Sequence, residues 1–369
     1  MTLISEQQKP GSTLPLSEKD DSQISFERDR GPLFVIGMWR SGTSLLYRLI
    51  NQHPEICLMY EGDLAVLGLL FSRFGRKPNW TEYWDFWSGA LRRHAIDPAT
   101  IPGSFKDLKT AMQTVYGAYA GSAIWGCKSP NYYDCLQELH QMFPNARFVI
   151  IWRDPSDVCR SVLRAGEVSY SWFNRRGMFH RSLMGHRVLK AECDALVRRG
   201  AHIHQIQYED LVGNPNTTMK GICDFLHLPF DQRMASLQGS DHSAIDPAAQ
   251  HKKVKTDRII VGEETTEILS DAQKSKIGRY VRFWREECNG WPQVHEPLDN
   301  ETNKASLAER IADWSIYSSF RGLDDVRKWI YCLAPLWLLN LYRVLAGKPS
   351  LLLRQKHSSE EKPKAPAVL

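Results

Sequence analysis

The chain has 369 residues, of which 43% are hydrophobic and 24% are charged, and its formal net charge is +5. This composition is typical of a globular protein with enough apolar residues for a large core. A small positive charge suits an anionic ligand, but it falls short of the basic stripe of a nucleic-acid-binding protein. We therefore expect no nucleic-acid partner.

The eight cysteines form no C-x-x-C pair, and none has the spacing with histidine that is typical of a metal site. Several lie in apolar segments, which predicts buried free thiols in a reducing compartment. Residues 1–30 are polar and contain no apolar signal segment, so we expect a disordered N-terminal arm. These features predict a cytoplasmic protein without a metal.

Apolar runs that favour strands alternate with amphipathic patterns that favour helices, as in βαβ units. The sequence predicts strands near 33–37, 55–59, 122–127, 147–152 and 202–207. It predicts helices over 43–52, 131–142, 155–165, 174–199 and 216–226. The run RFVIIW at 147–152 is apolar almost throughout, as expected of a strand buried on both faces. We therefore predict an α/β fold, with a central parallel β-sheet flanked by helices, in a domain that covers residues 31–295.

A helical insert is expected at about 62–121, between the second and third strands. It contains four aromatic residues with i, i+3, i+4, i+7 spacing, namely Trp80, Tyr83, Trp84 and Trp87. This spacing is typical of a helix that packs its aromatic face into the core. The same residues could also form an aromatic wall of an acceptor pocket, and the two interpretations are compatible.

After the main domain we predict a helical C-terminal extension over 296–350 and a disordered tail over 351–369. Residues 329–345 are strongly apolar, but Pro335, Asn340 and Arg343 interrupt them. The run is shorter than the roughly 20 apolar residues that a membrane-spanning helix needs. It fits either peripheral contact with the cytoplasmic face of a membrane or a helix that caps the main domain.

In an open parallel sheet, ligands bind beyond the carboxyl ends of the strands. Polar residues stand at these positions after all five predicted strands: Arg40 to Ser44, Glu61, Lys128, Arg153 and Tyr208. Two arginines, a lysine, a carboxylate and a phenol at one edge of the sheet indicate a site for a multiply charged anion.

The loop after the first strand resembles a phosphate-binding loop. The spacing from Gly37 to Gly42 fits the pattern G-x-x-x-x-G-K-[ST], but Thr43 replaces the lysine and Arg40 lies within the loop. Gly42 allows close approach of the backbone to an anion, and the amides of 42–45 open a helix that points at the ligand. The hydroxyls of Thr43 and Ser44 can donate hydrogen bonds to an anion. Arg40 adds a planar, permanently charged guanidinium with several N–H donors. The alternative is an ordinary helix N-terminus, with Ser41 as its cap.

The segment WRDPSDVCRSV indicates a second anion clamp. Arg153 ends a strand, Pro155 stands at a position where its missing N–H costs nothing, and Ser161 lies about two turns into the helix. The alternative is that Arg153 forms an ion pair with Asp154 or Asp157.

Together, GMWRSGTSLL, FVIIWRDPSDVCRSVL and QYEDLVGNPNTTMKGICDFLHLPF resemble the sulfotransferases that use 3′-phosphoadenosine 5′-phosphosulfate, over about 33–60 and 122–230. The resemblance implies the P-loop NTPase-like sulfotransferase fold and a sulfuryl donor that requires no Mg²⁺, so no P-loop lysine is needed. It also implies donor-binding residues, which are Arg40, Ser41, Gly42, Thr43, Ser44 and Leu45 at the 5′-phosphosulfate, Arg153 and Ser161 at the 3′-phosphate, and Tyr208 in the nucleotide pocket. Ala165 stands where the family has a further arginine, so we expect Lys255, Thr256 or Arg258 to supply additional contacts.

The pattern is closest to the tyrosylprotein sulfotransferases, because a histidine-proline turn at 53–54 precedes Glu61 and Lys128 stands in a KSP motif. By this resemblance Glu61 is the general base, while Lys128 and Arg40 neutralise charge on the donor. Gly62 and Asp63 replace that family's Thr-Arg, which argues against a peptide acceptor. His53 and Asp63 remain alternative bases.

We therefore expect sulfuryl transfer to an alcohol, phenol or amine on a small or amphiphilic, lipid-like acceptor. Two alternatives are a P-loop small-molecule kinase and a non-catalytic relative that binds a nucleotide or a membrane.

Overall fold

A computed structural model describes residues 31–73, 80, 90–97, 100–168, 178–245 and 249–260, with a few single positions between 270 and 341. The predicted arm at 1–30, the tail at 351–369, the apolar run at 329–345 apart from residue 341, and three of the four insert aromatics lie outside the described residues. The domain boundaries derived from the sequence therefore stay predictions.

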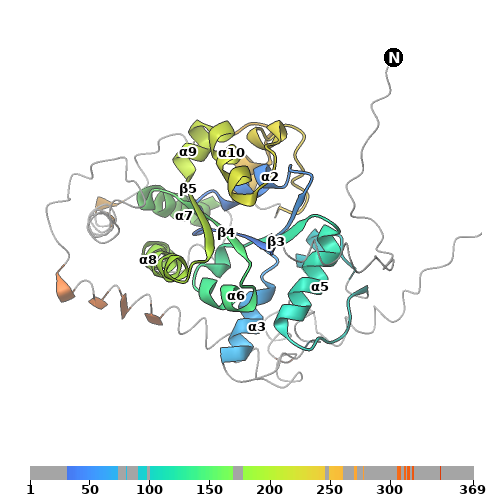
Figure 1. The fold of residues 1–369 in the computed structure, drawn as a ribbon. Helices are drawn as coiled ribbons and strands as arrows, with labels where there is room; N and C mark the ends of the chain where they lie inside the picture. The colour runs from blue at the N-terminus through green and yellow to red at the C-terminus, as the bar shows by residue number, and fades with distance from the viewer. Residues whose placement is uncertain are drawn as a thin grey trace, which may run out of the picture.

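A five-stranded parallel sheet organises the described chain, with the strand order β2-β3-β1-β4-β5 (Figure 1). The strands are β1 (Leu33–Ile36), β2 (Ile56–Tyr60), β3 (Ile124–Lys128), β4 (Arg147–Trp152) and β5 (His202–Gln207). All six residues of β4 are buried, as its apolar sequence predicted. The predicted α/β fold with a central parallel sheet is confirmed.

Helices cover both faces of this sheet (Figure 1). On one face pack α3 (Leu64–Arg73), α5 (Leu108–Ala120), α6 (Leu136–Met142) and α8 (Met178–Arg198). On the other pack α2 (Thr43–Ile50), α9 (Tyr208–Gly213) and α10 (Pro215–Leu226), while α7 (Pro155–Val168) lies against α8. Three short 3₁₀ helices, η2 (Pro130–Tyr132), η3 (Gln232–Ala235) and η4 (Ala249–Lys255), complete the described elements.

The two hydrophobic cores follow the alternation of side chains along the strands. Phe34 and Phe148 face the core beneath α5 and α6, whereas Val35 and Val149 face the core beneath α2 and α10. The register places Phe34 beside Phe148, with ring centroids 5.7 Å apart. A slip of one residue would exchange the two sets of side chains, so burial on both faces fixes the register.

The predicted helix over 131–142 is wrong at its start. The chain forms η2, a turn, and then α6 from Leu136. The Ser129 side chain accepts a hydrogen bond from the Asn131 amide, and the Asn131 side chain donates to Asp63. These bonds, one local and one to a distant residue, hold the first turn away from α-helical geometry.

The predicted insert contains α3 and α5. Trp80 is buried and its indole nitrogen donates to the Phe105 carbonyl at 2.9 Å. This contact confirms the core interpretation for Trp80.

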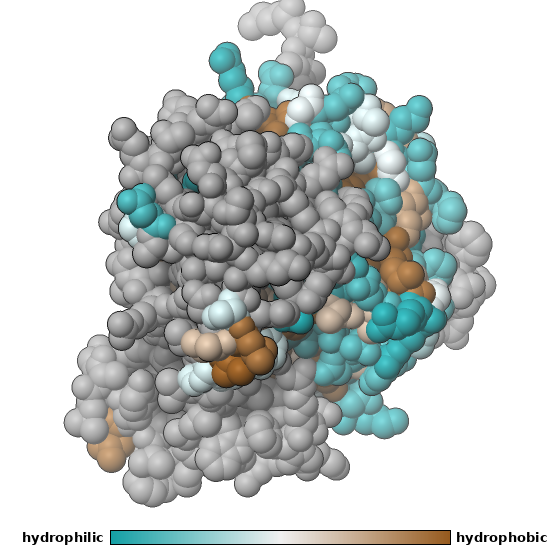
Figure 2. Space-filling model, turned by 90° about the vertical axis from the view of Figure 1, so that its left-hand side faces the viewer, coloured by the Kyte–Doolittle hydropathy of each residue, from teal (hydrophilic) through white to brown (hydrophobic). Residues whose placement is uncertain are grey.

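Hydrophilic side chains predominate on the described surface in Figure 2, with separate hydrophobic groups between them. Within the described part of the chain, no helix has the length and apolar character needed to cross a bilayer. Leu307, Ile311 and Trp314 are exposed apolar residues of the predicted C-terminal extension.

Two glycines give a test of the sheet packing. A Cβ at Gly126 of β3 would lie 1.8 Å from the Leu33 carbonyl oxygen, whereas a Cβ at Gly117 of α5 would have no heavy atom within 4 Å. We expect Gly126→Ala to reduce the free energy of unfolding by about 3 kcal/mol or more, because the backbone of β1 cannot move aside cheaply. Gly117→Ala should increase it by about 0.5–1 kcal/mol. Chemical denaturation of the two variants checks both signs, and a Gly126→Ala protein as stable as the wild type would contradict the packing described here.

Candidate active site at the carboxyl edge of the sheet

The loop between β1 and α2 is held in an open, left-handed conformation. Arg40 has φ 70° and Gly42 has φ 92°. Gly42 is the N-cap of α2, and no side chain caps this helix, so the interpretation of Ser41 as an ordinary cap is wrong. Ser41 is fully buried, and its hydroxyl has no hydrogen-bond partner in the described structure. A buried hydroxyl without a partner, beside helix amides that no side chain caps, is a feature that a bound anion would satisfy.

Tyr208 closes over this loop. A Cβ at position 42 would lie 2.3 Å from the Tyr208 ring, so the close approach requires glycine. The guanidinium of Arg153 stacks on the Tyr208 ring, 4.3 Å from the ring centroid. Tyr208 is the first residue of α9, directly after β5. The predicted nucleotide-pocket residue therefore lies against the predicted anion loop.

Arg40, Arg153 and Ser161 form one cluster. The Arg40 Nε donates to the Ser161 hydroxyl at 2.9 Å, and Arg153 Nη1 donates to the Arg40 carbonyl at 3.0 Å. The ion pair between Arg153 and Asp157 is long, at 3.8 Å, and Arg160 holds the same carboxylate at 3.0 Å. The alternative pairing of Arg153 with Asp157 is therefore present but weak.

The cluster concentrates positive charge. Burial and the neighbouring Arg153 lower the pKa of Arg40 from 12.5 to about 10. Two neighbouring guanidiniums repel each other unless an anion lies between or beside them. The electrostatics of this corner therefore favour a ligand with negative charge.

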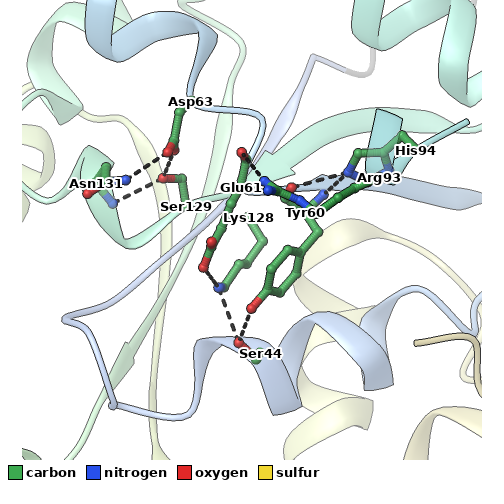
Figure 3. A network of polar contacts seen from close by, with 9 residues as sticks. All are labelled: Ser44, Tyr60, Glu61, Asp63, Arg93, His94, Lys128, Ser129 and Asn131. Atoms are coloured by element: carbon green, nitrogen blue, oxygen red, sulfur yellow. Dashed lines mark hydrogen bonds and ion pairs between the residues drawn. The ribbon is translucent and has the colours of Figure 1, made fainter. Parts of the chain in front are cut away.

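A second group of residues meets at the ends of β2 and β3 (Figure 3). Lys128, the last residue of β3, is 1% exposed, and its Nζ lies 2.8 Å from Glu61 Oε1. The same ammonium donates to the Ser44 hydroxyl at 3.3 Å and lies 4.1 Å from the centroid of the Tyr60 ring. The Ser44 and Tyr60 hydroxyls are 2.8 Å apart. Ser44 thus connects the anion loop to the Lys128–Glu61 pair.

Glu61 sits in a strained turn. Its φ is 48° and that of Asp63 is 46°, a conformation that costs a residue with a side chain of order 1 kcal/mol. The Glu61 amide donates to the Lys128 carbonyl at 2.7 Å, and the Asp63 carboxylate accepts from the side chains of Ser129 and Asn131. These bonds hold the turn so that the Glu61 carboxylate faces Lys128.

The Glu61 carboxylate is charged at neutral pH. Burial alone would raise its pKa, but the charge and hydrogen bond of Lys128, helped by His251 and Arg93, bring the pKa below its usual value. Burial and the charge of Glu61 raise the pKa of Asp63. Two neighbouring carboxyl groups therefore have pKa values displaced in opposite directions, which is typical of an acid–base site.

The alternative base His53 is bound through both ring nitrogens. Its Nε2 donates to the Pro229 carbonyl at 2.9 Å, and its Nδ1 accepts from the Glu55 amide at 3.1 Å. It is 2% exposed. This geometry favours Glu61 over His53 as the proton acceptor.

Lys255 and Thr256 lie at the end of η4, which packs against α7, the helix that carries Ser161. The Thr256 hydroxyl donates to backbone carbonyls of its own turn. The structure thus places the two residues beside the helix of the second clamp. Among the described residues, no group of three or more histidine, cysteine, aspartate and glutamate side chains is placed to hold a metal ion.

The sequence reasoning missed three side chains that contact this site. Tyr60 stacks on Lys128, and Arg93 of the insert donates to the Glu61 carbonyl at 3.5 Å. His94 accepts a hydrogen bond from the Tyr60 amide at 3.0 Å, and burial lowers its pKa to about 4, so it is neutral. Tyr60 directly precedes Glu61 and could have been found from its position, whereas no motif marks Arg93 or His94.

Comparisons with known proteins found one matching family model and several similar proteins. A model of the sulfotransferase family matches residues 32–232. Nodulation protein NoeE of Sinorhizobium fredii (strain NBRC 101917 / NGR234) is 30% identical over 148 residues, which is 37% of this chain and 33% of that protein. Protein-tyrosine sulfotransferase 1 of Danio rerio is 23% identical over 234 residues, 60% of this chain and 59% of that protein.

Among solved structures, the sulfotransferase domain from the curacin biosynthetic pathway aligns with a TM-score of 0.47 at 17% identity, covering 79% of this chain and 97% of that one. The chain spans about a third to six-tenths of the length of the two named relatives.

The Lys128–Glu61 pair should make the free energy of unfolding depend on pH. In the wild type, the lowered pKa of Glu61 gives stability that is present above the unfolded value of 4.5 and is lost as the pH falls through the folded pKa. In Lys128→Met, burial without the ammonium should raise that pKa, so stability is lost as the pH rises. We expect the difference in unfolding free energy between wild type and Lys128→Met to widen from pH 4 to pH 7, reaching about 2–4 kcal/mol.

Urea denaturation across this pH range measures the difference. The double variant Lys128→Met with Glu61→Gln is the control, because it has no carboxylate to titrate and its stability should lack this component. A difference between wild type and Lys128→Met that stays constant with pH would contradict the assignment of the pair.

Proposed function

The chain belongs to the sulfotransferase family, and we propose that it transfers the sulfuryl group of 3′-phosphoadenosine 5′-phosphosulfate to a hydroxyl or amine of an acceptor. The observation that carries this proposal is the Lys128–Glu61 pair, which Ser44 joins to the anion loop. A cation, a carboxylate and an anion loop in direct contact are the groups that sulfuryl transfer needs: charge neutralisation on the donor and proton removal from the acceptor.

The residues present fit the 5′ end of the donor. Gly42 opens α2 in a left-handed conformation, the N-terminal amides of α2 are not capped by a side chain, and the buried Ser41 hydroxyl needs a partner. Arg40, Ser41, Gly42, Thr43, Ser44 and Leu45 would hold the 5′-phosphosulfate.

The second clamp fits the other end of the donor. Arg153 and Ser161 would bind the 3′-phosphate, and their present links to Arg40 keep the two clamps adjacent. Tyr208 would line the nucleotide pocket, and Lys255 and Thr256 would add contacts beside α7.

Glu61 would remove the proton from the acceptor. The carboxylate is charged when the site is at rest, because Lys128 lowers its pKa. If Lys128 turns toward a bound anion beside Ser44, the carboxylate loses its partner and its burial raises the pKa. Glu61 therefore becomes a stronger base once the donor is in place. Lys128 and Arg40 would neutralise the charge that develops on the donor's leaving oxygen.

The acceptor we propose is a small or amphiphilic alcohol, phenol or amine. Asp63 stands two residues after the base and is bound to Ser129 and Asn131, so this position offers an acceptor group and not a cation to an acidic peptide. The aromatic side chain of Tyr116 lies next to this turn: a Cβ at Gly62 would lie 2.8 Å from the Tyr116 hydroxyl. Membrane contact through residues 329–345 is a further part of the proposal and would suit a lipid-like acceptor.

We expect Glu61→Gln to reduce kcat by about 10²–10⁴-fold, because the amide cannot accept the proton. The dissociation constant for adenosine 3′,5′-bisphosphate should stay within about twofold of the wild-type value, since Glu61 does not contact the nucleotide clamps. Acceptor-panel assays with ³⁵S-labelled donor, together with calorimetry, measure the two quantities. Once an acceptor is found in this panel, the same acceptor serves for each variant.

Asp63→Asn is the matched control, because it makes the same carboxylate-to-amide change two residues away. It should lose less activity than Glu61→Gln. The opposite order would assign the base to Asp63, and a wild type that binds the bisphosphate but sulfates nothing in the panel would favour a non-catalytic relative.

A further inference from the structure

Arg48 is a buried arginine that the catalytic proposal does not use. It lies in the last turn of α2, the helix whose first turn forms the anion loop, and it is 1% exposed. A guanidinium is costly to bury unless its donors are satisfied, so its contacts indicate what it does.

Among the described residues, the guanidinium of Arg48 donates hydrogen bonds to residues 237–240 and 254–256, which are distant from α2 in the sequence. Its Nη1 donates to the carbonyls of Val254 and Thr256, the latter at 2.8 Å. Its Nη2 donates to the Leu237 carbonyl at 3.2 Å, to the Ser240 carbonyl at 2.9 Å and to the Ser240 hydroxyl. Four backbone carbonyls and a hydroxyl therefore converge on one side chain, and the planar fork of arginine is suited to this many acceptors.

Charge supports the same geometry. Burial lowers the pKa of Arg48 from 12.5, and the carboxylates of Asp257, which follows Thr256, and of Asp241, which follows Ser240, oppose this shift. The positive charge also lies at the C-terminal end of α2, where the helix dipole favours a cation. Arg48 thus remains charged while its charge is spread over the segment it binds.

The bound segment reaches both parts of the site. Lys255 stands between the two residues whose carbonyls Nη1 binds, and η4 packs against α7, which carries Ser161. At the other end of η4, the His251 ring meets the Tyr60 ring edge-on, with centroids 6.4 Å apart. Fixing this segment therefore fixes side chains near the second clamp and near the residue that precedes Glu61.

We propose that Arg48 is a positioning residue that fastens residues 249–256 to α2, so that Lys255 and Thr256 complete the donor pocket. The inference rests on the proposed function, since it deepens the description of the donor site. It makes the donor loop and the distant segment one unit, because both are attached to the same short helix.

The test compares Arg48→Met with Arg147→Met. Arg147 is also buried and also binds backbone carbonyls, those of Leu226 and Gly31, but it begins β4 at the opposite edge of the sheet. Both variants should be less stable than the wild type. Only Arg48→Met should raise the calorimetric dissociation constant for adenosine 3′,5′-bisphosphate, by about tenfold or more, as expected when charged hydrogen bonds are lost.

Trypsin digestion measures, without any ligand, how firmly residues 249–256 are held. We expect faster cleavage after Lys253 or Lys255 in Arg48→Met than in wild type or Arg147→Met. If Arg48→Met does not fold, the variant Lys255→Met with Thr256→Ala keeps the backbone carbonyls that Arg48 binds and should still raise the dissociation constant about tenfold.

Equal affinity and equal cleavage in Arg48→Met and Arg147→Met would overturn the positioning role. An unchanged dissociation constant in the Lys255 and Thr256 variant would overturn it as well. A wild type that does not bind the bisphosphate would instead remove the proposed function, and with it this inference, whatever the digestion pattern.

Discussion

The ion pair between Lys128 and Glu61 is the interaction on which the rest of the site depends. Parallel pairing of β2 with β3 places Tyr60 opposite Lys128, so Glu61 is the next residue beyond the sheet, and its amide binds the Lys128 carbonyl. The register of two strands therefore brings the ammonium and the carboxylate together. An almost fully buried lysine is tolerated only with such a partner, and here its third contact, Ser44, belongs to the anion loop.

Cations and carboxylates lie close together at this edge of the sheet. Arg40, Arg153 and Lys128 bring three cations to the carboxyl ends of β1, β4 and β3. Glu61 pairs with Lys128, and Asp157 forms a longer ion pair with Arg153, at 3.8 Å. The two arginines contact each other through a backbone carbonyl and depress the pKa of Arg40. An anion bound at the loop would relieve this repulsion, and it would also draw Lys128 away from Glu61. In the proposed function, donor binding and base activation would both follow from this charge distribution.

Most of the fold was readable from the sequence because its signals are local. The apolar run of β4, the glycine of the anion loop and the alternation of strands with amphipathic helices each depend on a few consecutive residues. Their order places Glu61, Lys128 and Arg153 at one edge, since every strand runs in the same direction. The helix start at 131 was missed because Asn131 bonds to Asp63, which is far away in the sequence.

The remaining features of the site could not be predicted, because they depend on contacts between distant segments. Arg48 resembles any helical arginine until residues 237–256 are placed around it. From the sequence, His53 is an alternative base. Only the fold shows that its Nε2 is engaged by the carbonyl of the distant Pro229. The role of Arg93 beside Glu61 comes from the insert, whose sequence carries no motif.

The measurement that tests the account most directly is a thermal-shift comparison of adenosine 3′,5′-bisphosphate with Mg·ATP, on wild type and Arg153→Ala. It requires no knowledge of the acceptor. A ligand at a hundred times its dissociation constant adds about 2.7 kcal/mol of stability, so a clear rise in Tm is expected for wild type with the bisphosphate. The account predicts that this rise is absent with Mg·ATP and is lost in Arg153→Ala. Stabilisation by Mg·ATP alone would contradict sulfuryl transfer and would point to a kinase.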